Sequence, residues 1–300
     1  MLKVAFSPIY KYQLPEKHRF PMIKYELLPE QLVYEGTISE DSFFAPTLLR
    51  DEHILLTHTE GYLEKLNSLS LSYKEKRAIG FPIRNELINR GKYIANGTLQ
   101  CAYHAMDNGV SLNVAGGTHH SFADHGEGFC VFNDIAIAAN VLIHRGDVDQ
   151  ILIVDLDVHQ GNGTASIFQG NEVVTTFSMH GDKNYPLRKV QSDCDVGLPD
   201  RCGDDEYLSE LRAYLPKLLE KVQPDYVFYL AGADIIEPDL LGRLSLSRNG
   251  AKERDRYVYQ QCLDRSIPVA VAMGGGYSSS LVDIVEVHAN TFRLAQEMYF

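Results

Sequence analysis

The chain has 300 residues, and 45% of them are hydrophobic, so it is long enough to bury a large core. Its 28 basic residues against 40 acidic residues give a formal net charge of −12. This balance argues against a general nucleic-acid-binding protein, because such proteins need a positive surface to displace counterions.

Apolar runs typical of buried strands alternate with amphipathic, helix-like segments along the chain. The expected strands are residues 3–7, 111–116, 151–158, 173–179, 226–232 and 268–275. The expected helices are residues 85–107, 133–144, 204–222, 251–265 and 279–298. Continuous apolar strands separated by helices indicate an α/β protein whose mainly parallel sheet is covered on both faces. Because no linker or internal repeat interrupts the pattern, we expect a single domain over residues 1–300.

Targeting features are few. The N-terminus lacks the apolar segment and cleavage site of a signal peptide, and the apolar runs are too short to span a membrane. The five cysteines form no CxxC pair, which is typical of reduced thiols in a cytosolic protein. We therefore expect a cytoplasmic protein, with the nucleus as a second location if the source is eukaryotic.

Acidic and histidine residues gather where the strand 151–158 ends. Asp155, Asp157 and His159 alternate, so on a strand they would share one face. A buried carboxylate is costly unless it is paired or holds a metal, and this mixture of oxygen and nitrogen ligands suits Zn²⁺. Taken singly, each aspartate could instead cap a helix and the histidine could be a core residue.

Three other strand ends carry reactive side chains. Asp234 follows the strand 226–232, the pair His119–His120 follows two glycines, and Tyr277 follows three glycines. Ligands of open α/β sheets bind beyond the carboxyl ends of the strands. Together these residues predict a hydrolase in which Asp157, His159 and Asp234 bind a metal with an open position. The histidine pair would supply a base and an acid, and Tyr277 would donate to the developing oxyanion.

The order of these motifs resembles the histone deacetylase family. The blocks "GGTHHS", "GFCVFND", "DLDVHQGNGT", "SMH", "AGAD" and "GGGYS" occur in that order between Asn113 and Ser279. Gln160 and Asn162, where most branches carry His and Asp, are most similar to class IV enzymes and their bacterial relatives. The resemblance implies the arginase/deacetylase fold, a three-layer α/β/α sandwich around a parallel sheet of about eight strands.

The resemblance also implies roles for individual residues. It gives one catalytic Zn²⁺, held by Asp157, His159 and Asp234, with Fe²⁺ left open as the native metal. His120 would be the general base beside His119, Asp155 would orient His119, Asn162 would orient His120, and Tyr277 would be the oxyanion donor. The substrate tunnel would be lined by Gly128, Phe129, Tyr185, Leu241 and Gly275. A monovalent cation, K⁺ or Na⁺, would have as neighbours Asp155, Asp157, His159, Ser178 and Met179.

The function implied is a zinc-dependent hydrolase that removes acetyl or longer fatty acyl groups from the ε-amino group of lysine in proteins. One alternative is an amidohydrolase for acetylated small molecules such as acetylpolyamines. Another is a catalytically silent protein that binds acyl-lysine, although no metal ligand or tyrosine is missing. The binuclear manganese enzymes of the same fold are disfavoured because no extra carboxylate stands beside the paired histidines.

Overall fold

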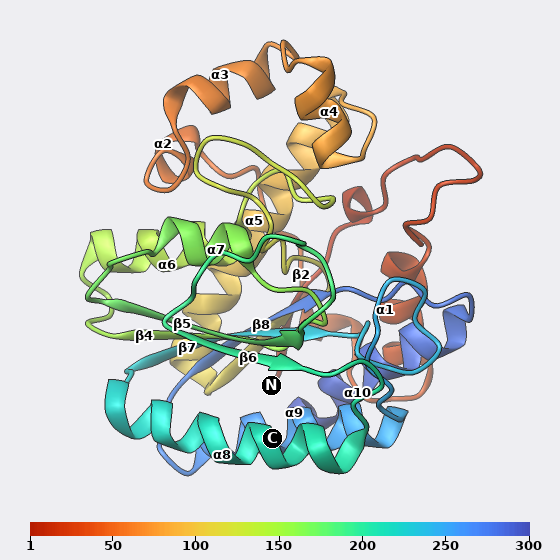
Figure 1. Ribbon diagram of the computed structural model, residues 1–300, viewed down its shortest axis with the longest axis vertical. Coiled ribbons are helices and arrows are strands. Elements are labelled where there is room, and N and C mark those ends of the chain that lie inside the picture. The colour runs from red at the N-terminus through yellow and green to blue at the C-terminus, as the bar shows by residue number, and fades with distance from the viewer.

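A single parallel sheet runs through the centre of the computed structural model, which describes residues 1–300 (Figure 1). Its eight strands lie in the order β2-β1-β3-β8-β7-β4-β5-β6, and every neighbouring pair is parallel. The strands are β1 (Lys3–Ala5), β2 (Phe43–Phe44), β3 (Val110–Asn113), β4 (Ile151–Asp155), β5 (Val174–Gly181), β6 (Cys194–Leu198), β7 (Tyr226–Gly232) and β8 (Val269–Gly274). The expected sheet of about eight strands is confirmed, and it is wholly parallel.

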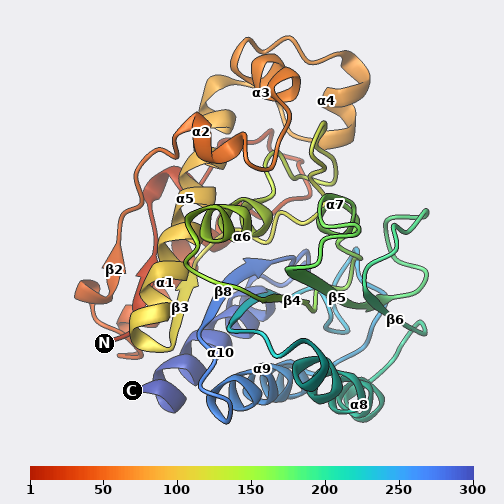
Figure 2. The same ribbon diagram turned by 90° about the vertical axis from the view of Figure 1, so that its left-hand side faces the viewer.

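Helices cover both faces of the sheet. They are α1 (Lys24–Tyr34), α2 (Asp51–Ile54), α3 (Glu60–Asn67), α4 (Tyr73–Ile79), α5 (Asn85–Asn108), α6 (Asp134–Arg145), α7 (Asn162–Ile167), α8 (Asp204–Val222), α9 (Arg248–Leu263) and α10 (Leu281–Tyr299), with short 3-10 turns at Pro8–Tyr10 and Glu40–Ser42. In Figure 2, α5, α6 and α7 lie on one face and α8, α9 and α10 on the other, while α2, α3 and α4 extend beyond the sheet. The three-layer sandwich is thereby confirmed. None of the helices is both long and apolar enough to cross a bilayer.

The central strands are apolar because they are buried on both faces. All five residues of β4 and all seven of β7 are buried, and all of them except Asp155 and Gly232 belong to one continuous hydrophobic core. Strands covered by helices on both sides show unbroken apolar runs instead of alternation. This is why the apolar runs located these two strands from sequence alone.

The expected strands and helices are all present, with ends that differ by at most three residues. The elements not expected were β2, β6, α7 and the four helices α1 to α4. β2 has only two residues, and β6 is an edge strand whose burial alternates, so neither forms an apolar run. α2, α4 and α7 have between four and seven residues each, too short for a helical period to show.

Four neighbouring strands bring the candidate residues together. β3, β8, β7 and β4 are adjacent in the sheet and parallel, so their carboxyl ends lie along one edge. The segments that leave these ends carry His119, Tyr277, Asp234 and Asp157. Residues separated by more than a hundred positions in the chain therefore meet in one crevice, as expected for open α/β sheets.

Candidate active site

The segment after β4 is a turn and not a continued strand. β4 ends at Asp155, so the expectation of a strand through residue 158, with three polar residues alternating on one face, was wrong. Asp155 Oδ1 accepts a hydrogen bond from the backbone N–H of Asp157 at 3.1 Å, and Asp157 Oδ1 accepts one from that of His159 at 2.9 Å. Aspartates that bond to the backbone two residues ahead favour turns over ladder pairing.

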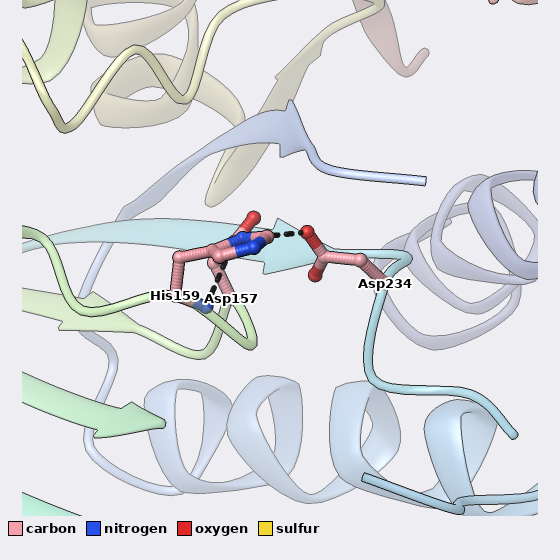
Figure 3. Close-up of side chains that lie close together, drawn as sticks. All are labelled: Asp157, His159 and Asp234. Atoms are coloured by element: carbon pink, nitrogen blue, oxygen red, sulfur yellow. Dashed lines mark hydrogen bonds and ion pairs between the residues drawn. The ribbon is translucent and has the colours of Figure 1, made fainter. Parts of the chain in front are cut away.

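The side chains of Asp157, His159 and Asp234 nevertheless converge (Figure 3). One potential ligand atom from each residue lies within 4.8 Å of the others, and all three residues are buried. His159 Nδ1 lies 2.9 Å from Asp157 Oδ1 and 3.2 Å from Asp234 Oδ2. The contact with Asp234 lacks hydrogen-bond geometry, so the buried Oδ2 has no donor. Two buried carboxylates and an imidazole, with one oxygen unpaired, fit a divalent metal ion.

The pKa shifts of His159 and Asp234 also indicate that a positive charge is needed between the two carboxylates. Burial opposes a charge on His159, but the carboxylates of Asp157 and Asp234 outweigh it and raise the pKa of His159 to about 10. Burial and the nearby Asp157 carboxylate raise the pKa of Asp234 to about 7. Without a metal, the imidazolium of His159 is therefore the positive charge that holds the two carboxylates together.

A histidine pair lies beside this cluster, with ring centroids 4.1 Å apart. His119 Nδ1 donates to Asp155 Oδ2 at 2.6 Å, and His120 Nδ1 donates to Asn162 Oδ1 at 2.7 Å. Burial lowers the pKa of His119, but the carboxylates of Asp155 and Asp157 reverse this and raise it above the ordinary value. Burial, and then the charges of His119 and His159, hold the pKa of His120 well below it. The surroundings thus move the pKa values of the two rings apart, so that His119 holds a proton more readily than His120.

Tyr277 reaches the site from the glycine run that ends β8. Its backbone N–H donates to Asp239 Oδ2 at 2.6 Å, and its ring centroid lies 6.2 Å from that of His159. Burial, followed by the carboxylates of Asp234 and Asp157, raises the pKa of Tyr277 well above its ordinary value. The hydroxyl therefore stays protonated and remains able to donate a hydrogen bond.

A cavity leads to this cluster from the surface. Its volume is about 260 Å³, and its lining includes Gly128, Phe129, Tyr185 and Leu241 together with His120, His159 and Tyr277. The Tyr185 ring stands perpendicular to that of His120, with centroids 4.9 Å apart. A smaller inner cavity of about 40 Å³ continues past the histidines and is lined by Gly275. These two cavities are thus lined by all five residues that the family resemblance implies for the tunnel.

Gly275 packs directly against the carboxylate of Asp234. Its φ is +62°, and a Cβ at this position would collide with the carboxylate of Asp234. Glycine adopts this conformation without steric cost and leaves room for the ligand set.

Three of the five expected neighbours of a monovalent cation, Asp155, Ser178 and Met179, lie on the adjacent strands β4 and β5, whereas Asp157 and His159 lie in the turn after β4. Asp155 is paired in register with Ser178, and Met179 follows it, all three being buried. The Oγ of Ser178 lies 3.0 Å from Nδ1 of His180. The strand pairing brings Asp155 and Ser178 together, and the cation itself stays a prediction.

Sequence reasoning missed three residues that support the site. Lys24, which is 3% exposed, donates from Nζ to the carbonyl oxygen of Gly275. Asp239 holds the backbone of Tyr277, and Glu127 contacts Asn162. Asp239 follows Asp234 by five positions, which is a weak signal. Neither Lys24, on a helix near the N-terminus, nor Glu127, in a loop, has a pattern that links it to the site.

The chain is similar to proteins of one family, both in sequence and in fold. A model of the histone deacetylase domain matches residues 17–292. An uncharacterized protein of Picosynechococcus sp. is 42% identical over 296 residues, covering 99% of each chain. Histone deacetylase 2 of Arabidopsis thaliana is 28% identical over 277 residues, covering 89% of this chain and 72% of that protein. The crystal structure of a histone deacetylase homologue from Aquifex aeolicus has a TM-score of 0.84 at 22% identity, covering 97% of this chain and 82% of that one.

Proposed function

The chain belongs to the histone deacetylase family, and we propose that it is a zinc-dependent hydrolase that removes acyl groups from the ε-amino group of lysine in proteins. The observation that carries the proposal is the buried Asp157–His159–Asp234 cluster at the inner end of the 260 Å³ cavity. We further propose that residues 1–300 act as one deacetylase domain, related to the class IV branch.

The proposed metal ligands are Asp157, His159 and Asp234. A divalent metal held there supplies Lewis-acid chemistry, polarising the amide carbonyl and making water more acidic. A cation would also satisfy the unpaired Oδ2 of Asp234 and replace the charge of His159. We also propose K⁺ or Na⁺ near Asp155 and Ser178.

His120 is the proposed general base, because its pKa is held below that of His119 and because it lines the cavity. It accepts a proton from the water that attacks the amide carbonyl. The Tyr277 hydroxyl donates to the carbonyl oxygen as negative charge develops there. A histidine then returns a proton to the departing lysine amine, so that one amide and one water become a carboxylic acid and an amine.

The entrance of the cavity favours acyl-lysine over acetylpolyamines. Arg19 and Arg77 both line it, and the Arg19 guanidinium lies 5.1 Å from the centroid of the Phe129 ring. Two cationic side chains at the entrance repel the additional ammonium groups of a polyamine. A lysine side chain that carries an acyl amide has no charge on the group that enters.

The proposal is tested by assaying the purified protein on acyl-lysine peptides of increasing chain length and on acetylated polyamines, with and without a chelator. We expect hydrolysis of at least one acyl-lysine peptide, lost on chelation and restored by Zn²⁺. Preferential hydrolysis of polyamines would contradict the substrate class, and activity that survives complete metal removal would contradict the metal.

A further inference from the structure

We propose that Glu127 is a positioning residue for His120, acting through Asn162: it fixes which ring nitrogen of His120 carries the proton. The inference rests on the proposed function, in which His120 is the general base. Glu127 lies in the loop between β3 and α6, whereas Asn162 begins α7. None of the proposed catalytic steps involves Glu127.

The three side chains form a continuous hydrogen-bonded series. Asn162 Nδ2 donates to Glu127 Oε1 at 2.5 Å, and Asn162 Oδ1 lies 2.7 Å from His120 Nδ1. Asn162 is 3% exposed and His120 is 5% exposed, so water does not compete at the inner contact. Glu127 is half-buried, and the backbone carbonyl of Glu127 accepts a hydrogen bond from the backbone N–H of Cys130 at 2.9 Å.

The chemistry of the donors and acceptors determines the proton position. An ionised carboxylate can only accept hydrogen bonds, so the edge of Asn162 that faces Glu127 must be its NH₂ group. The amide oxygen then faces His120, and because this oxygen can only accept, His120 Nδ1 must carry the hydrogen. The neutral ring is left with its lone pair on Nε2, the nitrogen not engaged by Asn162. That lone pair is what a general base needs.

An asparagine alone does not impose this arrangement. Its amide can rotate by half a turn and present NH₂ to His120, which would favour the opposite tautomer. Glu127 removes this ambiguity, because the rotated amide would aim its oxygen at a carboxylate. Two acceptors would then face each other at 2.5 Å with no hydrogen between them.

The test uses the zinc-loaded full chain and the substitution Glu127→Gln. Glutamine keeps the shape of the side chain but can donate as well as accept, so Asn162 becomes free to rotate. We expect kcat on an acyl-lysine peptide to fall about 10–100-fold, the usual range for outer-shell partners. KM should change little, because the tautomer affects the chemical step. The ¹⁵N spectrum of the His120 ring should change from pure Nδ1–H to a mixture of tautomers.

A matched control and a rescue variant separate this role from a general effect on the loop. Asp124→Asn removes a carboxylate from the same loop at a side chain that is 72% exposed, and it should leave kcat unchanged. The double variant Glu127→Gln/Asn162→Asp places an acceptor-only group beside His120 and a donor behind it. It should therefore recover activity relative to Glu127→Gln and exceed Asn162→Asp alone, in which two carboxylates face each other.

Two results would overturn the inference: wild-type kcat together with a pure Nδ1–H tautomer in Glu127→Gln, or a double variant no more active than Glu127→Gln. Failure of the proposed function is distinguishable. If the wild-type protein hydrolyses no acyl-lysine peptide, the proposed function fails, while the ¹⁵N spectra of wild type and Glu127→Gln still decide whether Glu127 sets the tautomer.

Discussion

The Oδ1 atom of Asp157 accepts two hydrogen bonds from His159, one from the backbone N–H and one from ring Nδ1, each at 2.9 Å. The first bond shapes the turn after β4, and the second positions the imidazole. A metal ion bound as proposed would replace only the second, because its ligand would be the ring nitrogen and the backbone bond would not be involved. The turn that carries two of the proposed ligands is therefore formed by the chain itself.

Metal uptake should release a proton from His159. Its pKa in the metal-free protein is raised to about 10, so the ring is charged at neutral pH and must become neutral to bind a metal. Apparent zinc affinity should fall about tenfold for each pH unit lowered between 9 and 7, since one proton competes. Below pH 7 the dependence should steepen, because Asp234, with a pKa raised to about 7, also takes up a proton.

Competition titrations with a chromophoric chelator between pH 6 and 9 measure this dependence. Calorimetry in buffers with different ionisation enthalpies counts the released protons. An ordinary histidine, with a pKa near 6.5, would give an affinity independent of pH above about 7.5. A flat profile between pH 7 and 9 would thus contradict the charged state of His159.

Substitutions of Asp157 should separate its two roles. In Asp157→Asn the amide oxygen can still accept from the backbone N–H of His159, whereas Asp157→Ala leaves this buried donor unpaired. Both variants should lose zinc and activity, because the charged ligand is gone. In metal-free urea unfolding, Asp157→Ala should be less stable than Asp157→Asn by about 1–3 kcal/mol, the cost of an unsatisfied buried donor. Equal stabilities would show that the backbone bond is unimportant, and stoichiometric zinc in either variant would contradict the ligand assignment.

The parts of the site that the sequence predicted are those attached to the central strands. Asp155, Asp234 and Tyr277 each follow an apolar run long enough to identify as a strand. Because the carboxyl ends of parallel strands lie at one edge of the sheet, the sequence alone predicts that these three residues lie close together. The strand predicted over residues 151–158 ends at Asp155, because side-chain carboxylates take the backbone N–H groups that a ladder would use.

The supporting residues could not be predicted, because loops and short helices bring them in. Lys24 reaches Gly275 across 251 positions of sequence, and Glu127 reaches Asn162 across 35. Neither contact follows from a periodic pattern, since one depends on how α1 packs against the loop after β8 and the other on how the loop before α6 packs against α7. Short-range turn chemistry is visible in a sequence, whereas the docking of one loop on another is not.

Gly128 should tolerate no side chain. Its φ is +56°, and a Cβ there would lie 2.5 Å from Cδ2 of the His120 ring. Gly128→Ala should lower kcat by displacing His120, and it should also lose stability from the strained backbone. Gly36→Ala is the matched control, because Gly36 has a similar φ of +76° and nothing within 4 Å of the added Cβ. Both variants should lose about 1 kcal/mol from backbone strain, with only Gly128→Ala losing activity. Normal kcat in Gly128→Ala would mean that this contact does not hold His120.

Tyr277→Phe should impair the chemical step and spare binding. Burial keeps the hydroxyl protonated, and Asp239 holds the backbone of this residue independently of the side chain. Loss of the hydroxyl should therefore leave the loop and the cavity wall in place. A donor whose hydrogen bond strengthens only in the transition state affects kcat more than KM. We expect kcat to fall about 10²–10³-fold, as for removal of an oxyanion donor, with KM and zinc content near wild type.

Tyr214→Phe, on the exposed face of α8, removes a hydroxyl far from the cavity and should change neither constant. If Tyr277→Phe instead raised KM while kcat stayed normal, the hydroxyl would be binding the substrate in its ground state, and the oxyanion role would have to be abandoned.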